Sequence, residues 1–81
     1  MKVCIKLFAV AKQRIGRDTI DVDLPEAATI RHLRSALIEQ YPPLADVVPH
    51  ARFALSSEYA ADSAPISADT EIAIIPPVSG G

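Results

Sequence analysis

The sequence has no tryptophan, a single cysteine and no long hydrophobic run. One cysteine cannot form an internal disulfide, and a structural zinc site needs about four ligands, so we expect neither a disulfide nor a bound metal. No apolar stretch approaches the ~20 residues that cross a bilayer. The N-terminal residues are too few and too interrupted by lysine for a signal peptide. These absences predict a reduced, cytoplasmic protein without a membrane partner.

A strong charge of one sign is also missing, since the formal net charge is -2 at pH 7. The basic residues are scattered, with only a loose group at Lys12, Arg14 and Arg17, which argues against nucleic acid as the main partner. The chain has 81 residues, which is room for one domain. Aromatic residues make up 5% of the sequence, so the core of this single domain (residues 1–81) must be aliphatic.

Alternation of apolar and polar residues predicts the strands. Residues 3–8 and 19–24 each alternate with period two, which is typical of strands that bury one face. The connection between them contains Gly16, so we expect a hairpin with a longer loop. Similar runs at 52–56 and 71–76 predict two more strands, and a short strand is expected near Tyr59. Ile66 is expected to pin the loop that follows to the core.

One main helix is predicted from about Ile30 to Gln40, because apolar residues recur there at helical spacing. Thr29 precedes it, and its hydroxyl suits the N-cap position. Prolines 42 and 43 end it. One helix packed across one face of a mixed sheet is the simplest two-layer arrangement for this order of elements. The predicted fold class is therefore α+β, the ubiquitin-like β-grasp, with an extended C-terminal tail.

The tail begins where two prolines end the last strand, since proline cannot donate ladder hydrogen bonds. Fully extended, six residues reach roughly 20 Å, enough to enter the active site of another protein. The two final glycines have no Cβ and fit a narrow channel. The tail residues are Pro76, Pro77, Val78, Ser79, Gly80 and Gly81.

The chemistry of the tail centres on the carboxylate of Gly81. A carboxylate is a poor electrophile until it is activated as an acyl-adenylate, after which a sulfur nucleophile can convert it to a thiocarboxylate. The tail offers no general base and no metal site. Partner enzymes must therefore supply the chemistry, while this chain carries the reacting atom much as a cofactor does.

Two segments carry a family resemblance that extends over essentially the whole chain. They are Leu7-Phe8-Ala9 followed by Gly16, and Glu71-Ile72-Ala73-Ile74-Ile75-Pro76-Pro77-Val78-Ser79-Gly80-Gly81. With these segments the chain resembles the small subunits of molybdopterin synthase, which are ubiquitin-like sulfur carriers. It departs from the family's usual pattern at Ser56, where an Asn is common, at Asp69-Thr70, where Gly-Asp is common, and at Lys12, where Arg is common.

The resemblance implies a mechanism and a set of partners. An E1-like adenylating enzyme would use ATP to activate Gly81, and a sulfurtransferase or desulfurase would supply the sulfur of the thiocarboxylate. The tail would insert into the large subunit of molybdopterin synthase and donate sulfur to cyclic pyranopterin monophosphate, forming the dithiolene. The chain would be a non-catalytic subunit of a heterotetramer and would bind no cofactor of its own.

A docking surface is predicted near the tail. Phe8 and Ile75 are out of phase with the apolar residues of their strands, so both are expected to be exposed, and they adjoin if the first and last strands pair. An exposed apolar patch beside a reactive tail is typical of a protein interface. The alternative is a local twist that turns Phe8 inward. By resemblance, Lys12 is a third candidate contact with the partner.

The remaining candidates for chemistry have simpler interpretations. Cys4 is expected to be a small apolar filler, and His32 and His50 to be solvated, because none has a partner at catalytic or ligand spacing. Two other functions stay open: a sulfur carrier for another pathway, such as thiazole (thiamine) or cysteine synthesis, and a ubiquitin-like protein modifier joined to lysines. The Pro-Pro-Val-Ser stretch favours the molybdopterin pathway.

Overall fold

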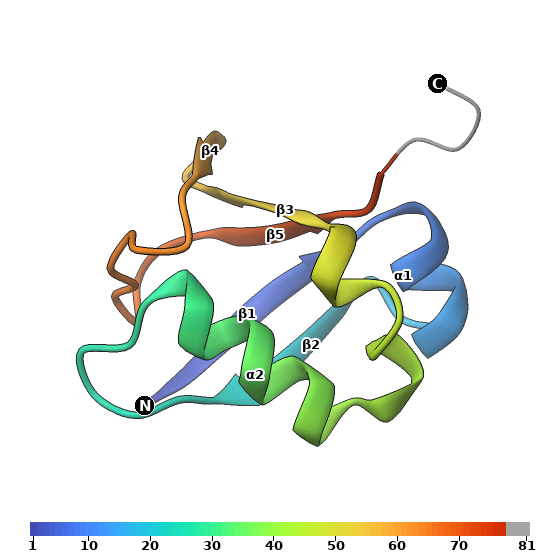
Figure 1. Ribbon diagram of the computed structural model, residues 1–81, viewed down its shortest axis with the longest axis horizontal. Coiled ribbons are helices and arrows are strands. Elements are labelled where there is room, and N and C mark those ends of the chain that lie inside the picture. The colour runs from blue at the N-terminus through green and yellow to red at the C-terminus, as the bar shows by residue number, and fades with distance from the viewer. Residues whose placement is uncertain (78–81) are drawn as a thin grey trace.

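The computed structural model describes residues 1–77, and its centre is one mixed sheet with strand order β2-β1-β5-β3-β4 (Figure 1). Two α-helices and two short 3-10 helices accompany the sheet. The strands are β1 (Lys2–Leu7), β2 (Thr19–Asp23), β3 (Arg52–Leu55), β4 (Glu58–Ala60) and β5 (Ile72–Ile75), and the helices are α1 (Ala9–Ile15), α2 (Ile30–Gln40), η1 (Pro42–Leu44) and η2 (Val48–His50). The predicted α+β class and β-grasp arrangement are confirmed.

The first and last strands lie side by side in the middle of the sheet. β1 pairs antiparallel with β2 and parallel with β5, with Ile5 opposite Ile72 and Leu7 opposite Ile74. β5 pairs antiparallel with β3 on its other side, with Phe53 opposite Ile74. The alternating apolar residues of these strands share one face because the side-chain period of a strand is two. This face is the sheet's contribution to the core.

α2 covers that face and supplies the other half of the core (Figure 1). Ile30, Leu33 and Leu37 follow at helical spacing and are fully buried. Burying one such side chain stabilises a fold by about 1.5–3 kcal/mol relative to leaving it exposed. Helix α2 begins and ends where the sequence predicted, between Thr29 and the prolines after Tyr41.

The N-terminus of α2 is capped with the help of a side chain for which the sequence predicted no structural role. Thr29 is the N-cap residue, as predicted, and it forms a capping box with His32. In this motif the backbone N–H of Thr29 donates a hydrogen bond to Nδ1 of His32 at 2.9 Å. His32 is exposed, as expected, but it therefore also helps to fix where the helix begins.

Residues 9–18 contain a helix where the sequence predicted only a loop. α1 ends at Gly16, which has a φ of 78° and donates its backbone N–H to the carbonyl of Lys12 at 2.7 Å. A residue in this left-handed conformation is the usual end of a helix, and glycine adopts it without strain. Only Ala11 of this helix is fully buried, so the segment carries little helical periodicity.

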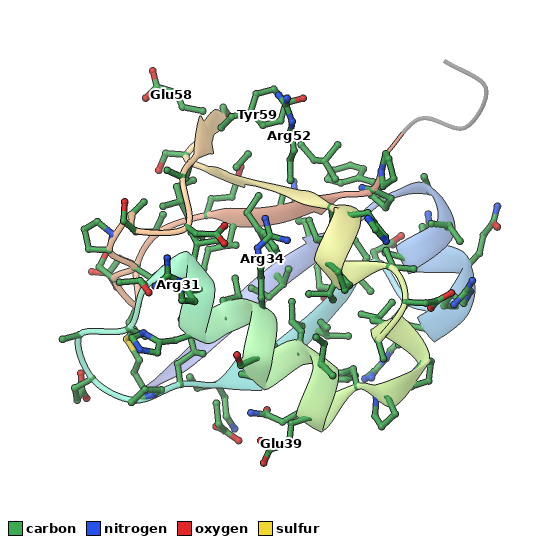
Figure 2. The ribbon with its side chains drawn as sticks, in the orientation of Figure 1. Arg31, Arg34, Glu39, Arg52, Glu58 and Tyr59 are labelled. Carbon is green, nitrogen blue, oxygen red and sulfur yellow. The ribbon has the colours of Figure 1, made fainter. Side chains whose placement is uncertain are left out.

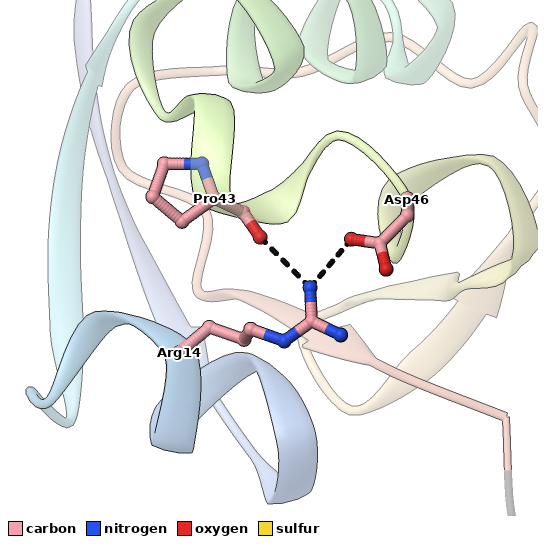
Figure 3. A network of polar contacts seen from close by, with 3 residues as sticks. All are labelled: Arg14, Pro43 and Asp46. Carbon is pink, nitrogen blue, oxygen red and sulfur yellow. Dashed lines mark hydrogen bonds and ion pairs between the residues drawn. The ribbon is translucent and has the colours of Figure 1, made fainter.

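Arg14 ties α1 to the segment that follows α2 (Figure 3). One guanidinium nitrogen donates to the carbonyl of Pro43 at 3.1 Å and also to the carboxylate of Asp46. This ion pair lowers the pKa of Asp46, chiefly through the hydrogen bond from Arg14. The segment itself is anchored by three buried apolar residues: Leu44, Val47 and Val48.

The β3–β4 hairpin places a short edge strand beside the rest of the sheet. Ser56 and Ser57 form its two-residue turn with φ values of 49° and 72°. Positive φ at both central positions is the pattern of a type I′ turn, in which Asn and Gly are preferred. The Asn common in the family near Ser56 therefore falls in this turn. Beyond β4, Ile66 is buried and donates its N–H to Ala28, so it pins the loop as predicted.

Candidate functional site

The sheet face opposite α2 is hollowed where four strands contribute side chains. The strand register puts Ala54 between Tyr59 on β4 and Ala73 on β5, and Ala73 beside Lys6 on β1. These residues line one hollow together with Phe8 and Ile75. They come from strands that also build the core, because each alternate residue points to the opposite face. We call this side of the sheet the open face.

The two apolar residues that the sequence placed at an interface do come together here. Phe8 follows β1 as the residue before α1 and is 46% exposed, and Ile75 ends β5 and is partly exposed. Both line the same hollow as Tyr59, whose side chain is 64% exposed. Phe8, Tyr59 and Ile75 form the apolar patch of the open face. The alternative in which Phe8 turns inward is not what the structure shows, and the role of the patch in binding stays a prediction.

Lys12 lies in a neighbouring hollow rather than in the patch itself. That hollow is shared with Lys6 and Phe8, so Lys12 is close to the patch. Its Nζ is 2.7 Å from Oδ1 of Asp18, and both side chains are exposed. The hydrogen bond and charge of Lys12 lower the pKa of Asp18. Lys12 therefore already has a carboxylate partner within the chain, which a protein partner would have to share or replace.

The C-terminal segment leaves the domain from the middle of the sheet. β5 ends at Ile75, Pro76 is buried, and Pro77 is exposed. Pro76 is thus packed on the domain, and the chain emerges at Pro77. The other predicted tail residues lie outside the described part of the chain: Val78, Ser79, Gly80 and Gly81.

A further hollow surrounds the point where the chain emerges, and we call it the exit hollow. Its lining residues are His50, Arg52, Tyr59, Ile75, Pro76 and Pro77. Tyr59 and Ile75 also belong to the apolar patch, so the exit hollow and the patch form one continuous surface. This arrangement has an apolar centre and a charged rim, which is the usual composition of a protein–protein interface.

Three residues of this surface were not predicted to belong to a functional site: Arg52, Tyr59, which marked only a short strand, and His50, which was expected to be merely solvated. The Arg52 guanidinium carbon is 5.2 Å from the centre of the Tyr59 ring, which is a cation–π contact (Figure 2). Alternation around the buried Phe53 does predict that Arg52 points outward. Its closeness to Tyr59 and to the exit of the chain depends on the hairpin register, which the sequence pattern does not contain.

Neither a metal site nor a membrane span is found in residues 1–77. No group of three or more His, Cys, Asp or Glu side chains is placed there to hold a metal ion. None of the helices within those residues has the length and apolar character needed to cross a bilayer. Cys4 is a free thiol and is exposed on β1, so it does not act as the small apolar filler that we expected.

The fold defines a ubiquitin-like β-grasp protein with an exposed apolar patch beside its C-terminal exit. Comparison with known proteins places this chain within that class. Residues 5–81 match the ThiS family. A molybdopterin synthase sulfur carrier subunit from Dictyostelium discoideum is 40% identical over 80 residues, covering 95% of this chain and 93% of the relative. The chain belongs to the ThiS family, and its resemblance to molybdopterin synthase small subunits is confirmed.

Two solved structures show how widely this fold is used. SAMP1 from Haloferax volcanii is 31% identical with a TM-score of 0.83, and the match covers 100% of both chains. The complex of subunits 1 and 2 of molybdopterin-converting factor from Helicobacter pylori contains a similar chain, 21% identical with a TM-score of 0.65 and 100% coverage of both. At that identity the second likeness concerns the fold alone.

Proposed function

We propose that this chain is the sulfur carrier subunit of a molybdopterin synthase. The observation that carries the proposal is the continuity between the apolar patch and the exit of the C-terminal segment. A partner that covers Phe8, Tyr59 and Ile75 is positioned to receive the residues beyond Pro77. The proposal is supported by the family match, which extends to residue 81, and by the name of the Dictyostelium relative.

The proposed partners follow from the chemistry of the terminal glycine. An E1-like enzyme transfers AMP from ATP to the Gly81 carboxylate and releases pyrophosphate. The persulfide of a sulfurtransferase or desulfurase then attacks the acyl carbon and AMP leaves, which gives an acyl disulfide. A thiol reduces this disulfide and releases the thiocarboxylate. The large synthase subunit takes this thiocarboxylate into its active site, where its sulfur passes to cyclic pyranopterin monophosphate and hydrolysis returns Gly81 to a carboxylate. Two such transfers, each from one thiocarboxylate, build the dithiolene.

This chain contributes the length of its C-terminal segment and a fixed point from which that segment starts. Pro76 is packed on the domain, and Pro77 fixes its own φ near −65°, so the chain begins its outward path in a defined direction. Four residues beyond Pro77 extend roughly 13 Å when fully stretched. The reacting carbonyl of Gly81 therefore reaches a site well inside the partner while the β-grasp domain stays at the partner's surface.

Intact-mass measurement tests the carrier proposal. The chain is incubated with ATP, an adenylating enzyme and a sulfur donor, and it should gain the mass difference between sulfur and oxygen. A chain lacking Gly81 should gain nothing and should melt at the same temperature, because we expect Gly81 to take no part in the core. Adding the large subunit and the pterin precursor should then consume the thiocarboxylate. Normal dithiolene formation by the truncated chain would contradict the mechanism.

A second candidate function is that of a protein modifier. It is favoured by the 31% identity to SAMP1, a small archaeal modifier protein, over the full length of both chains. A modifier forms an amide between Gly81 and lysines of other proteins. Mass spectrometry of tryptic digests separates the two functions, since a modifier leaves remnants of its C-terminus on lysines and a carrier does not. A sulfur carrier of another pathway would gain sulfur but form no stable complex with the large subunit.

A further inference from the structure

The exit hollow is basic although the chain as a whole is not. The formal net charge of the protein is -2, but the side chains from residues 1–77 that line this hollow include Arg52 and His50 and no carboxylate. The remainder of the lining is apolar or aromatic: Tyr59, Ile75, Pro76 and Pro77. Both basic residues are exposed, so an anion from outside the chain can reach them.

Arg52 is held in place without being neutralised. Its guanidinium lies against the Tyr59 ring, 5.2 Å from the ring centre, and its backbone pairs with Ile75 at the end of β5. The ion pairs found among residues 1–77 are Lys12–Asp18, Arg14–Asp46 and Arg34–Asp62, and none of them includes Arg52. Figure 2 shows Glu58, the adjacent acidic residue of β4, pointing away from Arg52.

A guanidinium arranged in this way is suited to a carboxylate. Its planar fork of N–H donors matches the two oxygens of a carboxylate, and stacking on an aromatic ring fixes the fork before the ligand arrives. A lysine at the same position would supply a point charge without the fork of N–H donors. Arg52 is therefore suited to bind an Asp or Glu side chain.

We propose that Arg52, positioned by Tyr59, binds a carboxylate side chain of the protein that receives the C-terminal segment. The occupant is assigned to the partner because the exit hollow is continuous with the apolar patch, which the partner covers in the proposed function. The inference rests on that proposed function. Its consequence is selectivity: a protein that presents an acidic residue beside its tail channel is favoured, and one that presents a basic residue there is repelled.

The first experiment compares charge reversal at two arginines. Calorimetric titration of the full chain into the large synthase subunit should show Arg52→Glu binding about 10- to 100-fold more weakly than wild type. The loss should be smaller at high salt, because screening weakens the repulsion that the variant introduces. Arg31→Glu is the matched control, since Arg31 is an exposed arginine of α2 and has no part in the open face (Figure 2). The control should bind like wild type.

The second experiment tests the role of Tyr59 as a positioning residue. Tyr59→Phe keeps the ring and should retain affinity, whereas Tyr59→Ala and Arg52→Ala should each lose it. If Tyr59 acts through Arg52, the double alanine variant should lose less than the sum of the two single losses. Additive losses would overturn the positioning role.

The competing occupant is the chain's own terminal carboxylate. The Nε–H resonance of Arg52 in the isolated protein should be the same whether the C-terminus is a carboxylate or an amide. A shift on amidation would show that the chain fills its own hollow and would overturn the assignment to a partner. Equal affinity of Arg52→Glu and wild type, in a protein that accepts sulfur and binds the large subunit, would also overturn it while leaving the carrier function intact. If the wild-type chain failed to gain sulfur or to bind the large subunit, both the carrier function and the assignment to a partner would be contradicted.

Discussion

The two faces of the sheet are built by the same strands and differ in almost every physical property. Toward α2, the alternate residues of β1 and β5 are fully buried aliphatic side chains such as Ile5 and Ile72. On the open face, their neighbours include the charged Lys6, the small Ala73 and the partly exposed Ile75, and Tyr59 of the adjoining β4 leaves 64% of its surface accessible. Because side chains alternate between the two faces of a strand, one face of this very small sheet can stabilise the fold while the other is available for recognition. Substitutions should therefore separate the two properties.

The largest effect is expected on the covered face. Leu33 of α2 is 0% exposed, and Leu33→Ala should lower the free energy of unfolding by about 2–5 kcal/mol, since it removes buried methyl groups and leaves a cavity. Urea denaturation followed by circular dichroism measures this change. Ile38→Ala on the same helix is the control, because Ile38 is 38% exposed and should cost far less. Equal losses at both positions would mean that α2 does not divide into a core side and a solvent side.

An intermediate effect, on binding alone, is expected on the open face. Phe8→Asp should weaken affinity for the large subunit by about 10- to 100-fold, because it places a charge in the centre of the apolar patch. The unfolding free energy should stay unchanged, since Phe8 is outside the core. Calorimetric titration and urea denaturation of the same preparation give both quantities. Unchanged affinity would exclude Phe8 from the interface, and a large loss of stability would break the division between the faces.

The smallest effect is expected at the Arg14–Asp46 pair, which belongs to neither face (Figure 3). The pKa of Asp46 is lowered in the folded chain, chiefly by its hydrogen bond from Arg14. A carboxyl with a lowered pKa stabilises the fold above its ordinary pKa, and this contribution is lost as pH falls through the lowered value. Asp46→Asn should therefore be slightly less stable than wild type at neutral pH and equal to it in strong acid. A difference that persists in acid would show that the charge is not its cause.

Much of this contrast was readable from the sequence, for a physical reason. The spacing of apolar residues indicates which side chains are buried. The inward residues of the strands and the boundaries of α2 were therefore predicted correctly. The exposure of Phe8 followed from the same pattern, whereas the pairing of the first and last strands was only a condition that the structure then met. α1 was missed because it buries only Ala11 completely, and a helix that buries so little of one side leaves no clear period.

The exit hollow was beyond the reach of sequence patterns because its parts are far apart in the chain. His50 belongs to η2, Arg52 and Tyr59 to the two strands of a hairpin, and Pro77 to the segment after β5. Their meeting depends on the register of β3 with both β4 and β5. Register is set by turn geometry and by core packing together, so the residue pattern of a single sequence does not reveal it.

The central position of β5 has a mechanical consequence. A partner that draws the C-terminal residues into a channel applies a force that passes through Pro76 into β5. Because β5 is hydrogen-bonded to β1 on one side and to β3 on the other, it cannot be peeled away like a strand at the edge of the sheet. Pulling along the axis of β5 strains its hydrogen bonds to β1 and to β3 at the same time, since those bonds run across the strand direction. The domain is therefore a firm anchor for a chain under tension.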